Sequence, residues 1–499
     1  MATTASASQL QTFTVSDAVE STNGVSAIHP DGTLAVIYTT GPSPKSVKVA
    51  IYRPASTGTG ADPLYSLAVR ITLATPAGAV TPTAGASPSC SHPTICPIED
   101  GFAYFYERRD TVLSPTTLTA GGLQIEMGKI KADGDGYTVY QSATAGKGYV
   151  LDNTVKAGHA GGAPTCAWVG RGNIVAVTFG HQLTYSLAAD DAQRTYDVRA
   201  AYLDFTPNAK PTLLSGGNRM GGSASGEATD GGYAAGATQT YLVTAVDLDD
   251  DQDLVTFNSG GGLPVCGFDD RGDFMVAYEF RNGKAGTGAI ALKIFKGPYR
   301  ASGLDTAAIY SDTSTFAATA GSLARNPSVA CRETAQVGAV LSSTAYLPSI
   351  LLAFSDVSPV AATASVTKAY TVSFPSEGSV TPVATAVTVP ANSNYDATAD
   401  NQTMPVSVDS PFLSAVVIQE ELVNTSGGDG YKFKIIHIDG GANSTVEVKH
   451  SQKIARPQRP NLKARTLRNG AKIAAVVYDG QDASGTGAEQ VYMELFQFA

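Results

Sequence analysis

A recurring hairpin pattern places the strongest constraint on how this chain can fold. The stretch LPVCGFDDRGDFMVAYEF (263–280) holds a proline, a strand of small residues, an Asp-rich turn closed by glycine, and an apolar strand ending in aromatics. Six further stretches follow the same plan, starting at Asn23, His92, Ala163, Asn326, Met404 and Arg459. Internal copies of this kind indicate one supersecondary unit used repeatedly, so the fold must be a repeat architecture.

Proline and glycine occupy fixed places in the pattern. Six copies carry a proline at the same place: Pro93, Pro164, Pro264, Pro327, Pro405 and Pro460. In three copies a glycine follows eight residues later: Gly101, Gly172 and Gly272. Proline suits the first residue of a strand, where no ladder donor is needed. Glycine supplies the positive φ of a tight hairpin turn.

Strictly alternating stretches, such as SVKVAIYRP from Ser46, follow the hairpins and are typical of strands with one buried face. Each unit therefore has four strands, and radial repetition of such units builds a β-propeller. The seventh unit ends after three strands, and LQTFTVSDA (10–18) can supply the fourth, leaving no open edge.

We predict an all-β fold: a seven-bladed β-propeller of four-stranded antiparallel blades, closed by the N-terminal strand joining the last blade. The domain covers residues 1–499, with a long loop insert at 216–262 in the third blade. Two shorter β domains divided near residue 260 are the alternative. The pattern P…A…D..G.F.VAYE, as in PVCGFDDRGDFMVAYEF, resembles bacterial and viral propeller repeats. This resemblance implies a fold and hardly any activity.

Composition argues against two kinds of partner. The net charge is −10 and there is no basic stripe, so we expect no nucleic-acid partner. No run of about 18 apolar residues occurs, so we expect no membrane span. The N-terminal stretch has neither the basic start nor the apolar core of a signal peptide.

One acidic stretch, VDLDDDQDLVTF, has carboxylates at alternate positions: Asp247, Asp249, Asp251 and Asp253. Oxygen ligands so arranged in a short loop can converge on one hard cation, which makes Ca²⁺ the candidate cofactor. The stretch resembles the DxDxDGxxD loops of integrin-like propeller repeats, but it has Gln252 and no glycine. A solvated acidic loop is the alternative.

The hairpin turns carry further acids: Asp31, Glu99, Asp100, Asp269, Asp270 and Asp409. In a propeller these turns lie on one face near the axis, where two carboxylates could act as acid and base on a glycan. Asp before Gly is also what such a turn prefers, and we favour that interpretation.

Four of the five cysteines, Cys96, Cys166, Cys266 and Cys331, fall in the first strands of consecutive repeats. We expect them to be spread round the ring as small buried hydrophobes, too far apart for bridges or one metal site.

No catalytic fingerprint is present in the sequence. The leading hypothesis is a non-enzymatic structural or binding propeller that presents loops to a protein partner, to further copies of itself or to a glycan. A virion, appendage or cell surface is the expected location. The alternative is a glycoside hydrolase or lyase with carboxylates at the propeller axis. A carboxylate pair facing an axial pocket would favour the enzyme.

Overall fold

The protein is described by a computed structural model. It describes residues 7–17, 20–42, 45–55, 65–76, 89–109, 124–153, 160–184, 195–214, 241–245, 264–268, 272–281, 288–295, 297, 308–320, 322–332, 349–357, 366–373, 383–389, 406–409, 415–422, 430–439, 442–448, 455–481 and 487–498.

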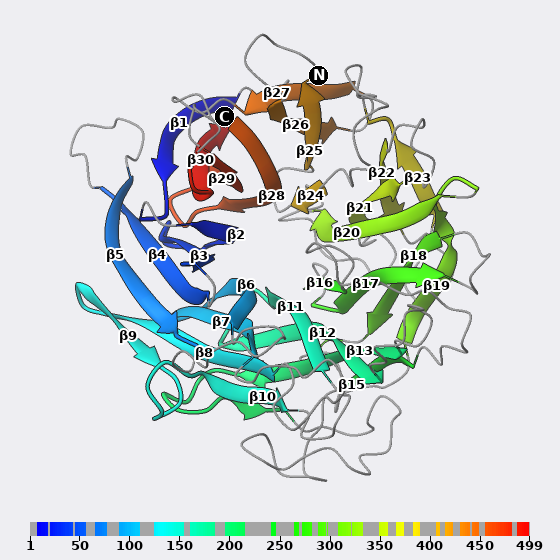
Figure 1. Cartoon of the computed structure of the whole chain (residues 1–499). Helices are drawn as coiled ribbons and strands as arrows, with labels where there is room; N and C mark the ends of the chain where they lie inside the picture. Colours follow the sequence, from blue (N-terminus) through cyan, green and yellow to red (C-terminus); the bar gives the residue numbers. More distant parts are fainter. Residues whose placement is uncertain are drawn as a thin grey trace.

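The described strands form seven separate antiparallel sheets arranged round a central axis (Figure 1). The first three sheets contain β2 (Ser21–Ile28), β3 (Leu34–Thr40), β4 (Ser46–Pro54) and β5 (Tyr65–Ala74); β6 (Ser89–Ile98), β7 (Gly101–Arg109), β8 (Gln124–Asp133), β9 (Gly136–Tyr140) and β10 (Tyr149–Asn153); and β11 (Ala160–Trp168), β12 (Ile174–Thr184), β13 (Thr195–Asp204), β14 (Thr212–Leu213) and β15 (Tyr241–Ala245).

The next three contain β16 (Val265–Phe268), β17 (Phe274–Arg281), β18 (Gly288–Phe295) and β19 (Ala308–Ala317); β20 (Leu323–Arg332), β21 (Ser349–Val357), β22 (Val366–Ser373) and β23 (Val383–Val387); and β24 (Val406–Asp409), β25 (Ala415–Leu422), β26 (Gly430–Asp439) and β27 (Ala442–Val448). The last contains β28 (Ala455–Thr466), β29 (Lys472–Gln481), β30 (Gln490–Phe498) and β1 (Ala7–Thr14). In each sheet the first strand of the repeat lies nearest the axis (Figure 1).

The N-terminal strand completes the last sheet. β1 pairs antiparallel with β30, with Thr12 opposite Glu494 and Thr14 opposite Tyr492. The sequence predicted this pairing, and the structure confirms it. Because the pairing joins the two ends of the described chain, the last sheet gains its fourth strand and the ring is closed.

The predicted four-stranded antiparallel blades are present, but the prediction is wrong for the second and third sheets, which each have a fifth strand. In the second sheet, β9 pairs with Lys129–Asp133 of β8, while β10 pairs with Gln124–Met127. In the third, β14 and β15 likewise divide β13 between them. The third strands, β8 and β13, are each ten residues long, so each accommodates two short partners on its outer edge. The sequence did not show this division because the short partners lack a long alternating pattern. β15 lies within the 216–262 insert.

The repeated proline lies at a β-bulge inside the first strand in four of the sheets. The register of the first and second strands skips two residues at His92–Pro93, Ala163–Pro164, Asn326–Pro327 and Arg459–Pro460. Expecting proline at the strand's first residue was therefore wrong for these copies, although Pro264 does directly precede β16. A bulge leaves its extra residue unpaired, so the missing proline N–H costs no ladder bond there.

Glycine closes the hairpin turns as predicted. The φ angles of Gly101, Gly172 and Gly272 are 153°, 59° and 81°. A Cβ on Gly101 would lie 2.0 Å from the Ile130 carbonyl oxygen. Glycine at that turn is therefore required both by the backbone angle and by the close approach of β8.

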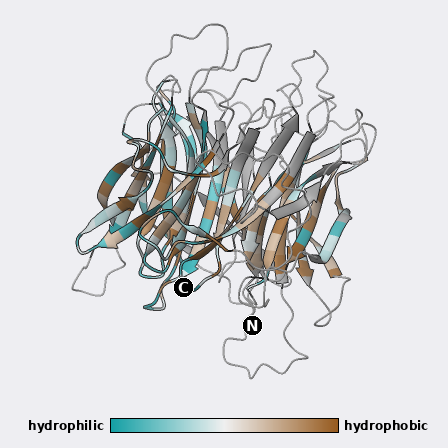
Figure 2. Cartoon of the chain, turned by 90° about the horizontal axis from the view of Figure 1, so that it is seen from below, coloured by the Kyte–Doolittle hydropathy of each residue, from teal (hydrophilic) through white to brown (hydrophobic). Residues whose placement is uncertain are grey.

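The hydrophobic core is divided into clusters that each lie between two neighbouring sheets. One cluster joins Ile51 of the first sheet to Tyr104 of the second. Another joins Tyr202 of the third sheet to Phe274 of the fourth, and so connects the parts of the chain before and after residue 260. The cluster between the sixth and last sheets includes Phe433 and Tyr478, whose ring centroids are 5.1 Å apart. Seen from the side, hydrophobic residues run along the strands through the thickness of the ring (Figure 2). The described part of the chain has no helix long and apolar enough to cross a membrane.

Candidate ligand site at the ring axis

A cavity of about 470 Å³ lies where the first strands of the sheets meet. Its wall comes from six of these strands. The lining residues are Ser26, Ala27 and Ile28 of β2; Ile95, Cys96 and Pro97 of β6; Cys166, Ala167, Trp168 and Gly170 on and just after β11; Cys266, Gly267 and Phe268 of β16; Val329, Ala330 and Cys331 of β20; and Lys463, Ala464, Arg465 and Thr466 of β28. The volume falls in the range typical of small-molecule sites.

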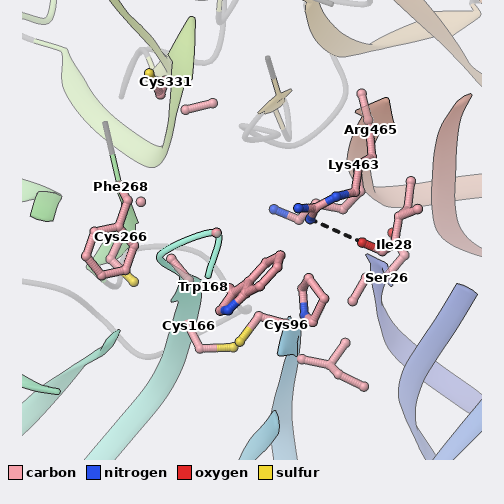
Figure 3. A pocket seen from close by; sticks show the side chains of 18 of the residues that line it. Ser26, Ile28, Cys96, Cys166, Trp168, Cys266, Phe268, Cys331, Lys463 and Arg465 are labelled. Atoms are coloured by element: carbon pink, nitrogen blue, oxygen red, sulfur yellow. Dashed lines mark hydrogen bonds between the residues drawn. The ribbon is translucent and has the colours of Figure 1, made fainter. Parts of the chain in front are cut away.

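The charged residues of this wall are both cations. Lys463 and Arg465 stand two residues apart on β28, so they share one face of the strand (Figure 3). No carboxylate is among the described residues that line the cavity. The pocket is therefore electropositive in a protein whose net charge is −10.

Arg465 spans the cavity. Its Nη1 donates to the Ile28 carbonyl oxygen at 3.3 Å, the dashed line in Figure 3. Its guanidinium carbon lies 4.9 Å from the ring centroid of Trp168, which belongs to β11. Trp168 is itself fixed by its Nε1, which donates to the Gly172 carbonyl oxygen at 2.9 Å. Two anchors thus hold the guanidinium in place, and the cation–π contact contributes about 0.5–2 kcal/mol.

Lys463 lines the same cavity as the thiols of Cys96 and Cys266. In the described part of the chain its ammonium has no carboxylate partner, while its charge reaches both Cys96 and Cys266. Burial raises the pKa of the Cys96 thiol well above its usual value and that of Cys266 to about 12, and Lys463 opposes both shifts. The thiols of Cys96 and Cys266 are therefore neutral near pH 7.

The structure corrects the expectation that the cysteines are too far apart to meet. Cys96 and Cys166 are on neighbouring sheets, yet their side chains lie next to each other in the cavity wall (Figure 3). Cys266 also approaches this group: its Sγ donates to the Thr165 carbonyl oxygen at 3.3 Å. First strands converge toward the axis, so residues on separate blades come closer there than blade spacing suggests (Figure 1).

The described turn acids are engaged in the turns themselves. Asp31 accepts the Thr33 N–H at 2.8 Å and lies 2.8 Å from His29 Nδ1. Burial opposes ionisation of Asp31, but these two contacts outweigh it and hold the pKa of the carboxyl well below its usual value. Asp100 Oδ2 lies 2.8 Å from the ammonium of buried Lys129. The Asp31 contacts agree with the turn interpretation, whereas Asp100 pairs with a residue of β8.

Several predicted site residues lie outside what the structure describes. The candidate calcium ligands Asp247, Asp249, Asp251 and Asp253 are among them, as are Asp269 and Asp270. The backbone of Asp409 ends β24, and its side chain is outside the description. Among the described residues, no group of three or more His, Cys, Asp or Glu side chains is arranged to hold a metal ion.

Sequence reasoning missed Lys463, Arg465 and Trp168 as cavity residues. A signal was present: the copy RPNLKARTLRNG has two cations just after its proline, where four other copies have a cysteine. If the first strands of all copies had been taken to line one central cavity, the cations and the thiols would have been expected in the same wall.

No protein-family model matches the chain, and no curated protein matches its sequence. Among solved structures, a Dyadobacter fermentans protein of unknown function aligns over 99% of both chains, with 7% identity and a TM-score of 0.41. A Trypanosoma rangeli sialidase aligns over 81% of this chain and 54% of its own, with 8% identity and a TM-score of 0.40. A Penicillium chrysogenum α-L-arabinanase aligns over 81% and 92%, with 9% identity and a TM-score of 0.38. Similarities at this level leave the function to be argued from the site.

Proposed function

We propose that the protein is a non-catalytic binding propeller whose axial cavity holds a small anionic ligand. The observation that carries this proposal is the charge of the wall: Lys463 and Arg465 are present, and its described lining includes no carboxylate. Cations in a concave site with low-dielectric walls concentrate anions near them. A glycosidase site would instead require a pair of carboxylates.

Each cation has a separate role in the proposal. Arg465 is held between Ile28 and Trp168, so its planar guanidinium is oriented before a ligand arrives. A guanidinium held in this way can form a bidentate pair of hydrogen bonds to a carboxylate. Lys463 has no carboxylate partner among the described residues and can move toward the ligand as a point charge.

The rest of the wall fits a ligand with a compact, partly apolar body. Phe268 and Trp168 supply ring surfaces, and Ser26 supplies a hydroxyl. An acidic monosaccharide or disaccharide satisfies the charge, the ring surfaces and the volume together, and it is the glycan class that we propose. Loop presentation to a protein partner, or self-assembly on a virion or cell surface, stays a prediction of the sequence.

The test is an array of acidic and neutral glycans, followed by calorimetry on the compounds retained. We expect acidic sugars to bind and Lys463→Met to weaken binding about 10- to 100-fold, the usual contribution of a charged hydrogen bond. Lys472→Met, which removes the same charge from β29 outside the cavity, is the matched control. The proposal would be refuted if neutral sugars bound as tightly as acidic sugars. It would also be refuted if Lys472→Met weakened binding as much as Lys463→Met.

A glycoside hydrolase is the second candidate, because exposed Glu99 follows Pro97 of the cavity wall by two residues. It would act with a second carboxylate from the turns outside the description, such as Asp269 or Asp270. Release of a chromophore from acidic aryl glycosides, abolished in Glu99→Gln, would support this activity. Binding of the same glycosides without any turnover would support the binding propeller.

A further inference from the structure

The cavity wall contains a pair of thiols contributed by two different sheets. Cys96 comes from β6 and Cys166 from β11, and both are reduced in the structure. Their side chains lie next to each other in Figure 3, and both line the cavity. The proposed ligand site has no need of this contact, so the pair calls for a separate explanation.

The surroundings make Cys96 and Cys166 partners for each other rather than for the remaining cysteines. Thr94, two residues before Cys96, places its hydroxyl 3.6 Å from Cys166 Sγ. Cys266 has bonds of its own: its Sγ donates to the Thr165 carbonyl oxygen at 3.3 Å and accepts from the Thr165 hydroxyl at 3.8 Å.

The two thiols also differ in access. Both line the cavity, but Cys96 is only 4% exposed, whereas Cys166 is partly exposed. A small oxidant entering the cavity therefore meets Cys166 first, and Cys96 is placed behind it as the second thiol. An exposed thiol with a resolving cysteine beside it is the arrangement found at sites of reversible oxidation.

We propose that Cys96 and Cys166 form a thiol–disulfide site that a peroxide closes across the boundary between the second and third sheets. The Cys166 sulfur attacks one peroxide oxygen, the O–O bond breaks, and a sulfenic acid and one water form. The Cys96 sulfur then attacks the Cys166 sulfur, the S–O bond breaks, and the oxygen leaves as a second water. Two electrons pass from the thiols to the peroxide, and both thiol protons end in water.

The disulfide would connect first strands, which lie nearest the axis, and would leave the outer strands of the sheets without a new bond. It would close a loop of 70 residues between positions 96 and 166 and tie β6 directly to β11. Cross-links over long loops restrict the unfolded chain most, so the oxidised protein should unfold at a higher temperature.

Peptide mapping of the full chain tests the proposal without any ligand, so its outcome is independent of the proposed function. The protein is treated with hydrogen peroxide, denatured, alkylated without reductant and digested. We expect one disulfide-linked pair of peptides containing Cys96 and Cys166, with Cys331 alkylated as a thiol. A link from Cys166 to Cys266, or sulfinic acid on Cys166 beside an alkylated Cys96, would overturn the proposal.

Two variants extend the test. Cys166→Ser should abolish the linked peptide and leave Cys96 alkylated, while Cys331→Ser, which removes another cysteine of the cavity wall, should retain the link. The oxidised wild-type protein should lose its raised unfolding temperature on reduction with dithiothreitol. An unchanged unfolding temperature, with the link present, would refute the cross-ring constraint. The peptide map of the wild-type protein decides the chemistry even if a variant fails to fold.

Discussion

The backbone N–H of Asn23 donates to Asp479 Oδ2 at 2.8 Å, although 456 residues separate the two. Asn23 is at the bulge of β2 with a φ of 58°, and Asp479 is near the end of β29. The next N–H, that of Gly24, also points to this carboxylate, at 3.3 Å from Oδ1. One buried acid in the last sheet therefore satisfies the unpaired bulge donors of the first.

The same arrangement recurs between the fourth and fifth sheets. Glu279 of β17 accepts the backbone N–H of Asn326 at 2.9 Å, and Asn326 has a φ of 52° at its bulge. Arg325 adds a 2.8 Å ion pair to Glu279. In these two pairs of sheets the acid near the end of the second strand is thus a brace between blades.

We predict that Asp479→Asn destabilises the protein by about 1–3 kcal/mol. The amide keeps one acceptor oxygen but turns an N–H₂ toward a backbone donor, leaving a buried donor unsatisfied. Urea unfolding measures the change. Asp135→Asn, at an exposed hairpin position, is the control and should shift stability by less than about 0.5 kcal/mol. Equal effects from both substitutions would show that the brace contributes nothing.

Gly24→Ala should destabilise the closure between the first and last sheets. A Cβ at Gly24 would lie 2.5 Å from Val491 Cγ1 and 2.7 Å from Val477 Cγ1, and overpacking of this kind costs about 1–3 kcal/mol. Gly136→Ala is the control, because its Cβ would meet only the Asp133 carbonyl oxygen, at 3.6 Å. Combining Gly24→Ala with Val491→Ala should cost less than the sum of the single changes. If the free-energy changes of the two single substitutions add exactly in the double variant, the Gly24 Cβ does not clash with Val491.

The stability of the protein should fall as pH rises from about 4.5 to about 8 through Glu494. Burial raises the pKa of this carboxyl to about 8, while hydrogen bonds from Tyr478 and Gln9 oppose the shift. The folded state keeps the proton that the unfolded state releases, so this group removes up to about 1.4 kcal/mol per pH unit in that window. Glu494→Gln should lose this part of the slope in urea titrations at several pH values. An unchanged slope would show that Glu494 ionises normally in the fold.

Arg465→Gln should change the emission of Trp168, the sole tryptophan, and weaken the protein by about 0.5–1 kcal/mol. The substitution removes the cation stacked on the indole while retaining a hydrogen-bond donor for the Ile28 carbonyl. Fluorescence of the folded protein reads out the environment of the cavity directly. Arg171→Gln, at an exposed position near Trp168 in sequence, is the control. If the emission of Arg465→Gln matches that of the wild type, the guanidinium does not rest on the ring in solution.

The sequence by itself determined the features that depend on residues close together along the chain. Its alternating stretches defined the strands, its glycines defined the positive-φ turns, and LQTFTVSDA was identified as the strand that pairs with the last sheet. These properties follow from local backbone geometry and the two-residue period of a strand, both of which can be read along the chain.

Only the tertiary structure decided which side chains meet at the axis and across blade boundaries. The bulge shifts the register within the first strand, and such a shift changes which face a side chain occupies. Lys463 and Cys96 line one cavity, and Asp479 accepts from Asn23, because the ring brings together residues that lie hundreds of positions apart. No local pattern encodes that proximity, so the charge of the cavity and its paired thiols emerge only once the ring has closed.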